Sequence, residues 1–543
     1  MKKETKQIKS NKTKVIFVTG GVISGIGKGI AAASLGNILK SRGFKIFMQK
    51  LDCYLNIDPG VLSPYEHGEV FVTEDGGETD LDLGHYERFI DENLLKESNY
   101  TTGKIYKRIF ENERKGKYEG KTVQLVPHFT NEIINVIDSA IKKEKPDFHI
   151  VEIGGTVGDI ESNPFLKAIS DYSFQNTNST FFIHVTFVPW LNASREFKTK
   201  PTQNSLSTLA SNGIRPNMIF LRSQNQISDT IINKIANNTY IPKDNIVALP
   251  DFDSVYKIPL YLESQNVCEK ILKHFSLKGK KSNLVEWEKF VNKIEAPNKT
   301  EINIAMVGKY VELEDAYKSI KEALLISSVH KNAHLNLKWI SSVEIDEKNV
   351  NLKLRDIDGV VVLPGFGKRG FEGKVISVNY TRENKIPTLG ICFGMQAMTI
   401  NQARLKGIKN ATSSEISDKG TFILDIIEGK DKENIGGTLR LGLGSIDLVE
   451  GSLIHKIYGQ NKIYERSRHR YEVNQKYISK LKDKEFQFSG YHGDEQLVEV
   501  CELTNHPFYI GVQYHPEFTA RPLKPSKLFS AFIESILKIK RQQ

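Results

Sequence analysis

Residues 15–36 read VIFVTGGVISGIGKGIAAASLG, and this stretch decides the fold of the first half of the chain. Its apolar start predicts a strand, its glycines a tight turn, and the alanine-rich segment after Lys28 a helix. Such a turn lets backbone N–H groups close around phosphates, and Lys28 can reach the terminal ones. Val22 stands where a standard phosphate loop has its first glycine, and Gly29 replaces the Ser/Thr that would hold Mg²⁺. The stretch indicates a variant phosphate loop; a glycine turn used only for packing is the alternative.

Further apolar runs at 149–153 and 180–185 alternate with helical patterns, which predicts a parallel sheet in an α/β layer. A second series of such runs begins at 302–308 and includes 359–363, 386–390 and 508–514. The fold class predicted is therefore α/β, with two Rossmann-like parallel-sheet domains.

The division along the chain follows from these two series. We expect a basic tail over 1–14, a first domain over 15–275, a linker over 276–300 and a second domain over 301–543. The linker is rich in lysine and asparagine, and Trp287 is the large apolar residue expected to anchor it. It is compatible with a short helix docked through that tryptophan.

Composition narrows the class of protein. The 543 residues contain four cysteines without metal-ligand spacing, which favours a reducing compartment, and the N-terminus lacks the apolar stretch of a signal peptide. The tail carries six lysines and one glutamate, so its net charge of +5 is half of the net charge of +10 of the whole chain. Because no arginine-rich or aromatic stripe accompanies the tail, we expect no binding to nucleic acid. No segment approaches the roughly 18 uninterrupted apolar residues of a membrane span, so we also expect a cytoplasmic protein that does not bind membrane.

Two regions offer carboxylates for a metal. Residues 66–87 hold eight acidic side chains, of which Asp80 and Asp82 share one face if the segment is extended. Glu152 stands in an apolar strand just before two glycines, where a lone buried charge is costly. A carboxylate at the end of a strand beside a phosphate loop is suited to Mg²⁺. For most of the acidic segment, a solvated loop is the alternative.

A short cationic loop follows, with Lys198, Lys200 and Gln203 in the sequence KTKPTQ. It would suit a second polyphosphate. Two lysines in a loop are usually only solvated, so the motif is weak by itself.

A reactive thiol is predicted in the second domain. Cys392 lies in GICFGMQ, at a strand-to-helix turn, and His515-Pro516-Glu517 follows 123 residues later. The N-terminus of a helix favours a thiolate, a histidine can take the thiol proton, and a carboxylate can orient the imidazole. A free cysteine usually only packs, but the flanking glycines and the His-x-Glu pattern favour a nucleophile.

Longer blocks carry a resemblance over nearly the whole chain. They are TGGVISGIGKGIAAASLG, SPYEHGEVFVTEDGGETDLDLGHYERF, VEIGGTVGDIESNPF, KTKPTQ, MVGKY, LGICFGMQ, RHRYEVN and YHPEF. Their content and order resemble the CTP synthase family, and their combined specificity is very high. The resemblance implies a phosphate-loop amidoligase (synthetase) domain joined to a class I glutamine amidotransferase domain.

The implied activity is a C–N ligase reaction in pyrimidine nucleotide biosynthesis. ATP phosphorylates the uracil 4-oxygen of UTP, and ammonia released from L-glutamine displaces the phosphate to give CTP. Family members also have a tunnel for ammonia, activation by GTP, feedback inhibition by CTP, and a homotetrameric assembly, so these are expected here together with Mg²⁺.

The resemblance also assigns residues by position. Those expected at the ATP site are Gly25, Ile26, Gly27, Lys28, Gly29, Ile30, Lys50, Asp82, Pro250, Asp251 and Phe252. Those expected to contact UTP or CTP are Ser24, Asp159, Ile160, Glu161, Lys198, Thr199, Lys200, Pro201, Thr202, Gln203 and Lys234. Asp82 and Glu152 match Mg²⁺ ligands. The expected catalytic residues are Cys392, His515 and Glu517, and those expected at glutamine are Gly365, Phe393, Gly394, Met395, Gln396, Glu415 and Arg470.

One departure concerns the loop beside the oxyanion. The family usually reads PGGFG where this chain has Leu363-Pro364-Gly365-Phe366-Gly367, so Pro364 takes the place of the first glycine. Proline has no N–H, and losing an oxyanion donor typically costs about 10²–10³-fold in rate. A donor from Gly365 or Phe393 would avoid that loss.

Two other functions remain open at this point. One is another glutamine-fed amidoligase with the same two domains. The other is a nucleotide-switch protein in which the phosphate loop controls assembly and Cys392 is inert.

Overall fold

A computed structural model describes residues 12–426 and 439–542, which form two compact units. Unit 1 holds residues 12–58 and 85–291, and unit 2 holds the remaining described residues, 59–84, 292–426 and 439–542. The predicted basic tail lies outside the described residues up to position 11. The described helices include none that is both long and apolar enough to cross a membrane.

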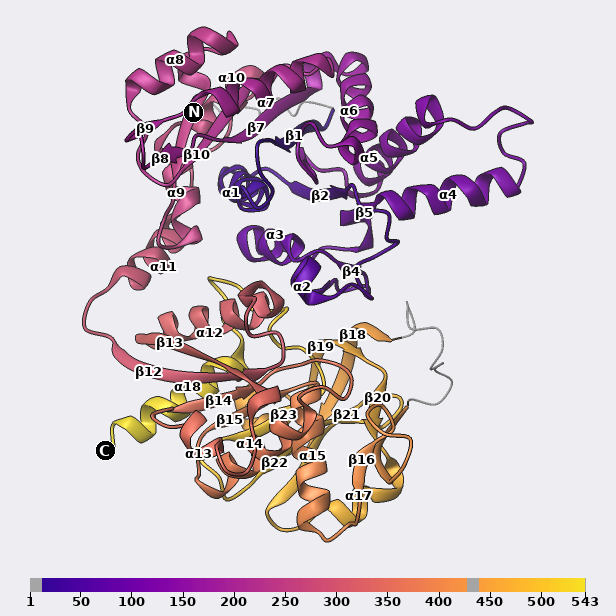
Figure 1. Ribbon diagram of the computed structural model, residues 1–543, viewed down its shortest axis with the longest axis vertical. Helices are drawn as coiled ribbons and strands as arrows, with labels where there is room; N and C mark the ends of the chain where they lie inside the picture. Colours follow the sequence, from indigo (N-terminus) through magenta and orange to yellow (C-terminus); the bar gives the residue numbers. More distant parts are fainter. Residues whose placement is uncertain (1–11, 427–438, 543) are drawn as a thin grey trace, which may run out of the picture. The chain divides into compact units, whose positions relative to one another are not determined.

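Unit 1 is built on a seven-stranded sheet in which every paired neighbour is parallel, as predicted (Figure 1). All seven positions of the central strand β1 (Lys14–Gly20) are buried, as expected where helices cover both faces. Across the sheet the order is β11 (Ile246–Pro250), β10 (Met218–Ser223), β7 (Thr180–Phe187), β1, β6 (Phe148–Ile153), β2 (Ile46–Asp52) and β5 (Asn99–Thr101).

Helices connect and cover these strands. They are α1 (Lys28–Ser41), α4 (Thr102–Arg114), α5 (Thr130–Glu144), α6 (Asn163–Gln175), α7 (Lys200–Ser211), α8 (Asp229–Thr239), α9 (Ile258–Ser264) and α10 (Val267–His274). A small hairpin joins β8 (Trp190–Leu191) to β9 (Glu196–Phe197). The helix α3 (Asp82–Ile90) begins in unit 2 and ends in unit 1.

The linker contains the docked helix that its tryptophan suggested. This helix, α11 (Val285–Glu295), buries Trp287 against the rings of Phe89 and Tyr256. The Trp287 Nε1–H donates to the carbonyl oxygen of Tyr256 at 2.8 Å. A buried indole N–H needs such a partner, so this contact fixes the helix on unit 1.

Unit 2 has a nine-stranded sheet that is parallel over only part of its width. The parallel part has the order β13 (Ala333–Ser341), β12 (Thr300–Gly308), β14 (Gly359–Val362), β15 (Thr388–Ile391) and β23 (Tyr509–Val512). It continues antiparallel through β22 (Val498–Leu503), β21 (Phe486–His492), β18 (Arg440–Leu448) and β19 (Lys462–His469). The prediction of a parallel sheet therefore holds for five strands and missed the antiparallel extension.

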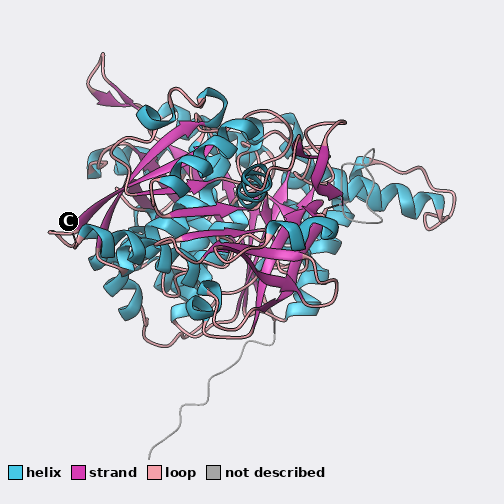
Figure 2. Ribbon diagram, turned by 90° about the horizontal axis from the view of Figure 1, so that it is seen from below, coloured by secondary structure: helices cyan, strands magenta, loops and turns pink. Residues whose placement is uncertain are grey.

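Helices pack on this sheet as well, and Figure 2 shows the helices in cyan and the strands in magenta. They are α12 (Lys318–His330), α13 (Val350–Lys353), α14 (Phe371–Glu383), α15 (Phe393–Leu405), α16 (Leu453–Tyr458), α17 (Gln475–Leu481) and α18 (Lys527–Lys540). A three-stranded sheet of β16 (Ala411–Ser413), β17 (Thr421–Ile426) and β20 (Tyr471–Val473) completes the body of the unit.

Residues 59–84 pack into unit 2, which the continuous domain boundaries expected from the sequence do not anticipate. This 59–84 segment contains α2 (Pro64–His67), β3 (Phe71–Val72) and β4 (Glu78–Thr79). Phe71 is fully buried, with its ring 5.0 Å from that of Phe518 and 5.5 Å from the Arg466 guanidinium. Arg468 Nε pairs with the buried Glu78 carboxylate at 2.9 Å. Apolar burial and a buried ion pair thus hold the segment on β19.

We expect Phe71→Ala to destabilise unit 2 by about 3–5 kcal/mol, because it removes a fully buried aromatic ring and leaves a cavity. Thermal unfolding followed by calorimetry would show the loss. Tyr464→Ala is the control, since Tyr464 lies in the same unit with 60% of its surface exposed and should change stability by less than about 0.5 kcal/mol. Equal shifts in the two variants would contradict this packing.

Candidate functional site

Cys392 sits at a sharp turn between β15 and α15. Its backbone has φ 51° and ψ −102°, a conformation that L residues rarely adopt, and its N–H donates to the carbonyl oxygen of Val512 at 2.7 Å. A Cβ on Gly394 would lie 2.2 Å from the Val362 carbonyl oxygen. Glycine therefore lets the first turn of α15 press against β14, and this close approach fixes the position of the sulfur.

His515 follows β23 and lies beside the thiol. Its Nδ1 is 2.7 Å from Glu517 Oε1, and both side chains are buried. Burial lowers the pKa of His515, but the Glu517 carboxylate and Cys392 outweigh burial and raise it to about 10. An imidazolium therefore stands next to the sulfur at neutral pH, which is the pairing of a thiol nucleophile with its proton-transfer partner. The Gln513 Nε2–H also donates to Sγ, at 3.5 Å.

These three residues line a cavity of about 550 Å³ within unit 2. Among the residues predicted to hold glutamine, Gly365, Glu415 and Arg470 line the same cavity. Phe393, Gly394, Met395 and Gln396 instead form the buried first turn of α15. Of these four, Gln396 uses its Nε2–H groups on Tyr471 O and Gln513 Oε1, so the structure places it behind the cavity wall.

The charges in the cavity suit an amino acid. Burial raises the pKa of Glu415 to about 7, against the opposing effects of the Gly367 N–H and nearby cations that include Arg470. The Gly367 N–H donates to Glu415 Oε1 at 2.6 Å. A carboxylate and a guanidinium at one end of the cavity can bind the ammonium and carboxylate of an α-amino acid, while its side chain reaches Cys392.

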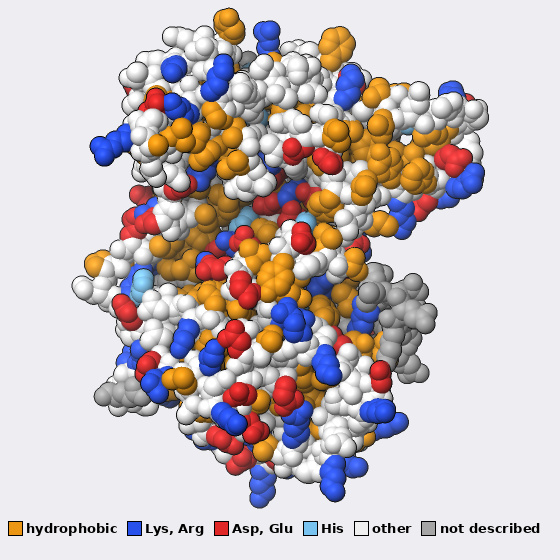
Figure 3. Space-filling view, in the orientation of Figure 1, with side chains coloured by type: hydrophobic (Ala, Val, Ile, Leu, Met, Phe, Trp, Pro, Cys, Tyr) orange, Lys and Arg blue, Asp and Glu red, His pale blue; other side chains and the backbone are white. Residues whose placement is uncertain are grey.

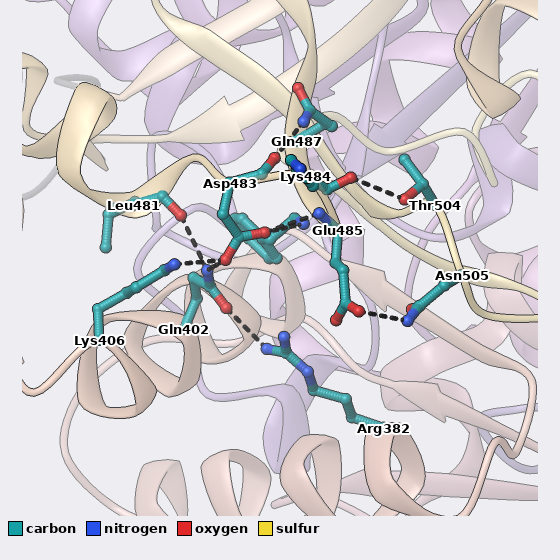
Figure 4. A network of polar contacts seen from close by, with 11 residues as sticks. Arg382, Gln402, Lys406, Leu481, Asp483, Lys484, Glu485, Gln487, Thr504 and Asn505 are labelled. Atoms are coloured by element: carbon teal, nitrogen blue, oxygen red, sulfur yellow. Dashed lines mark hydrogen bonds and ion pairs between the residues drawn. The ribbon is translucent and has the colours of Figure 1, made fainter.

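The far end of α15 is fastened by a polar network (Figure 4). Gln402 donates to the carbonyl oxygen of Leu481 at 2.8 Å and to Asp483 at 3.1 Å, and Arg382 donates to Gln402 Oε1 at 2.7 Å. Lys406 pairs with Asp483 at 2.5 Å. Burial opposes the change, but these and backbone hydrogen bonds hold the pKa of Asp483 well below its usual value. The helix that carries the nucleophile at its start is thus held at both ends.

In unit 1, a glycine turn joins β1 to α1, which is the strand–turn–helix arrangement predicted for the phosphate loop. Ser24 and Gly25 are exposed, Gly27 ends the loop with φ 89°, and α1 begins at Lys28, so Gly29 and Ile30 belong to its first turn. The Lys28 Nζ donates to the carbonyl oxygen of Gly155 at 2.8 Å. Val22 adopts φ 81°, which is strained for a β-branched residue. The loop therefore keeps a backbone shape that its sequence does not favour.

Arg222 on β10 is a residue that the sequence reading missed. Its guanidinium donates to the carbonyl oxygens of Ile26, at 3.2 Å, and Pro250, at 2.9 Å, and it pairs with Asp251 at 2.5 Å. It therefore joins the phosphate loop to the stretch Pro250–Phe252 that was predicted beside adenine. A charged residue near a strand end was the only signal in the sequence.

Glu152 lies near the end of β6, in register with Val18 on one side and Lys50 on the other. It is buried and accepts a hydrogen bond from the Tyr86 hydroxyl. Asp82 starts α3 and belongs to unit 2. Over the described ranges, no group of three or more His, Cys, Asp or Glu side chains is arranged to hold a metal. Mg²⁺ on a nucleotide usually uses one or two carboxylates with the phosphates, so the donor chemistry of Glu152 fits that ion.

The residues predicted to contact UTP or CTP come from several elements. Asp159 and Glu161 are exposed beside Ile160, which is 81% exposed. Thr199 and Thr202 are buried at the start of α7, around Lys200, Pro201 and Gln203. Lys198 pairs with Glu196, and both Lys198 and Lys234 lower the pKa of Glu196. The structure therefore brings these two lysines to one carboxylate.

The fold and both sites define a class of protein: a phosphate-loop synthetase unit joined to a cysteine-dependent glutamine amidotransferase unit. A family model described as CTP synthase N-terminus matches residues 14–277, and one described as glutamine amidotransferase class-I matches residues 312–535. The matched ranges agree with the resemblance found in the sequence.

Relatives extend this agreement to the full length. The CTP synthase of Mycoplasmopsis pulmonis is 56% identical over 98% of this chain and 99% of its own, and that of Shouchella clausii is 47% identical over 96% and 99%. A solved glutaminase domain of Trypanosoma brucei CTPS with bound acivicin is 30% identical, covers 44% of this chain and 94% of its own, and has a TM-score of 0.42. The chain belongs to the CTP synthase family. The two alternatives left open by the sequence receive no support from these relatives.

Removing the charge of Glu517 should slow the reaction of Cys392 with an electrophile. In Glu517→Gln, burial dominates and the pKa of His515 falls, so the imidazolium next to the Cys392 sulfur is lost at pH 7. We expect iodoacetamide to alkylate Cys392 about tenfold more slowly at pH 7, or slower still, as followed by mass spectrometry. Labelling is selective because burial raises the pKa of each of the other thiols, Cys53, Cys268 and Cys501, to about 12. An unchanged rate at pH 7 would show that Glu517 does not control the imidazole.

Arg222→Met should weaken the nucleotide site of unit 1, because it frees the phosphate loop from the Pro250 side. We expect the KM for ATP in the ammonia-dependent reaction to rise about tenfold, as for the loss of one or two hydrogen bonds to a charged group. Arg215→Met is the matched control, since Arg215 is an exposed arginine of the same unit. A similar KM in both variants would rule out this role for Arg222.

Proposed function

We propose that this chain makes CTP from UTP, with ATP as the energy source and L-glutamine as the nitrogen source. The observation that carries the proposal is the cavity that gathers Cys392, His515 and Glu517 with Glu415 and Arg470. Full-length relatedness to enzymes named CTP synthase supports the choice of UTP as acceptor.

In the glutamine half-reaction, the Cys392 sulfur attacks the amide carbon and the carbonyl electrons move to oxygen. The C–N bond then breaks, and His515 gives its proton to the leaving nitrogen, so ammonia and a thioester form. Water, activated by the now neutral His515, attacks the thioester and releases glutamate and the thiol. Glu517 keeps the imidazole oriented throughout. Backbone N–H groups of Gly365 and Phe393 are the donors available to the oxyanion.

In the synthetase half-reaction, the uracil 4-oxygen attacks the γ-phosphorus of ATP and ADP leaves. Ammonia then adds to C4, phosphate departs and loss of a proton gives CTP. The phosphate loop and Lys28 bind the ATP phosphates, and Arg222 fixes the loop. The lysines at 198, 200 and 234 supply positive charge for the UTP triphosphate.

Mg²⁺ would be held by the carboxylates of Asp82 and Glu152 together with the nucleotide phosphates, and it would neutralise charge that develops on the transferred group. The Tyr86 hydroxyl, which donates to Glu152, orients that carboxylate. A hydrogen bond to a metal ligand commonly fixes the orientation of that ligand and alters its affinity for the metal.

The finer properties of the family are part of the proposal: GTP as activator, CTP as feedback inhibitor, a homotetramer and a cytoplasmic location. A groove of about 670 Å³ in unit 1, lined by Leu55, Ile57 and Phe110 among others, supports self-association. Figure 3 shows hydrophobic side chains gathered over this part of unit 1. Four free cysteines are compatible with a reducing compartment.

Cys392→Ala should abolish CTP formation from glutamine and leave CTP formation from ammonium unchanged, because only the first reaction needs the nucleophile. The increase in absorbance that accompanies conversion of UTP to CTP measures both reactions. Cys501→Ala is a control at another buried cysteine of unit 2 and should retain both activities. Loss of the ammonium reaction in Cys392→Ala would contradict two separate sites, and absence of CTP in the wild-type chain would contradict the proposal itself.

A further inference from the structure

Lys374 is a fully buried lysine on α14, and the proposed mechanism gives this helix no role. Within the described ranges, no carboxylate lies within ion-pair distance of its Nζ. Burying an unpaired ammonium is costly, so the hydrogen bonds that Lys374 makes must offset that cost. The contacts of Lys374 therefore indicate what it does.

Those contacts are with the loop 363–367 beside the nucleophile. The Lys374 Nζ donates to the carbonyl oxygen of Leu363 at 2.5 Å and to that of Pro364 at 3.3 Å. It also lies 4.9 Å from the ring centre of Phe393, the residue after Cys392. One side chain thus touches both segments that carry candidate oxyanion donors.

The Pro364–Gly365 peptide is trans, so its C=O and N–H point in opposite directions. Because the Pro364 carbonyl faces Lys374, the N–H of Gly365 faces away from Lys374. Gly365 lines the cavity that also contains Cys392. The hydrogen bond from Lys374 therefore sets which face of this peptide is presented to the substrate.

The rest of the loop is held in the same manner. The buried Lys309, which follows β12, donates to the carbonyl oxygen of Phe366, and the Gly367 N–H is taken by Glu415. Pro364 has no N–H to offer. The Gly365 N–H is consequently the first donor that this loop can direct at an oxyanion, and its direction depends on Lys374.

We propose that Lys374 is a positioning residue for glutamine hydrolysis, which orients the Pro364–Gly365 peptide so that the Gly365 N–H faces the oxyanion formed at the glutamine amide carbon. This inference rests on the proposed function of the same cavity. It also explains how the chain keeps an oxyanion donor although proline replaces the usual first glycine. A hydrogen bond presented only to the transition state raises kcat without tightening substrate binding.

The charge state of Lys374 does not alter this role. Burial and then the neighbouring Lys309 lower its pKa to about 7, while Cys392 and Glu415 oppose the change. An ammonium and a neutral amine both carry N–H groups, so the carbonyl oxygens of Leu363 and Pro364 have a donor in either state.

The test uses Lys374→Met, which keeps the length of the side chain and removes the donor. We expect kcat for glutamate release to fall about 10²-fold, with the KM for glutamine within threefold of wild type. Alkylation of Cys392 by iodoacetamide should be unchanged, because thiol reactivity does not require the oxyanion donor. Ammonium-dependent CTP formation should also be unchanged. A merely structural role would shift KM, alkylation and thermal stability together.

The matched control is Lys527→Met. Lys527 is a lysine of the same unit that also donates to a carbonyl oxygen, that of Tyr458 at 2.6 Å, and it does not line the cavity. This variant should hydrolyse glutamine at the wild-type rate. If Lys374→Met does not fold, Lys374→Gln, which keeps one N–H donor on a shorter side chain, should show a smaller fall in kcat at constant KM.

An unchanged kcat in Lys374→Met, or a raised KM in either Lys374 variant, would overturn the inference. Glutamate release by the wild-type chain tests the proposed function. The ratio of kcat in the Lys374 variant to kcat in the wild type tests the role of Lys374. The two can therefore fail separately.

Discussion

The backbone conformation of Cys392 is the constraint on which the glutamine site depends. A positive φ at a non-glycine residue is unfavourable, and it persists here because the surrounding strands leave no alternative. The Cys392 N–H is tied to β23, and Gly394 lets α15 press against β14. The strand that accepts this N–H also leads into His515, so the nucleophile and its base are attached to the same strand.

The antiparallel half of the second sheet extends this arrangement outward. It places β19 so that the carbonyl oxygen of Arg466 accepts the backbone N–H of His515 at 2.8 Å. The guanidinium of the same residue donates to the carbonyl oxygen of Val72 at 2.9 Å. The backbone of His515 is therefore held by β19, a strand of the antiparallel extension. The five parallel strands do not provide this hydrogen bond.

Much of the fold and family could be predicted from the sequence because the signals are local. A strand, a glycine turn and a helix are contiguous in the sequence, and Trp287 stands as an apolar anchor in a lysine- and asparagine-rich stretch. What could not be predicted depends on contacts between distant segments. The 59–84 segment reads as part of the first domain, Arg222 as an ordinary charged residue in a strand, and Lys374 as a solvated lysine on a helix. Each acquires its role only through burial.

The contacts of Arg466 and Arg468 with the 59–84 segment limit how chimeras of two related chains can be built. Arg468 is 390 residues from its partner Glu78, so the pair spans any junction placed between the two halves of the gene. A chimera joined near residue 291 would combine the 59–84 segment of one parent with the receiving surface of the other. The two catalytic halves are consequently not exchangeable as intact modules unless the short N-terminal segment is exchanged together with the amidotransferase half.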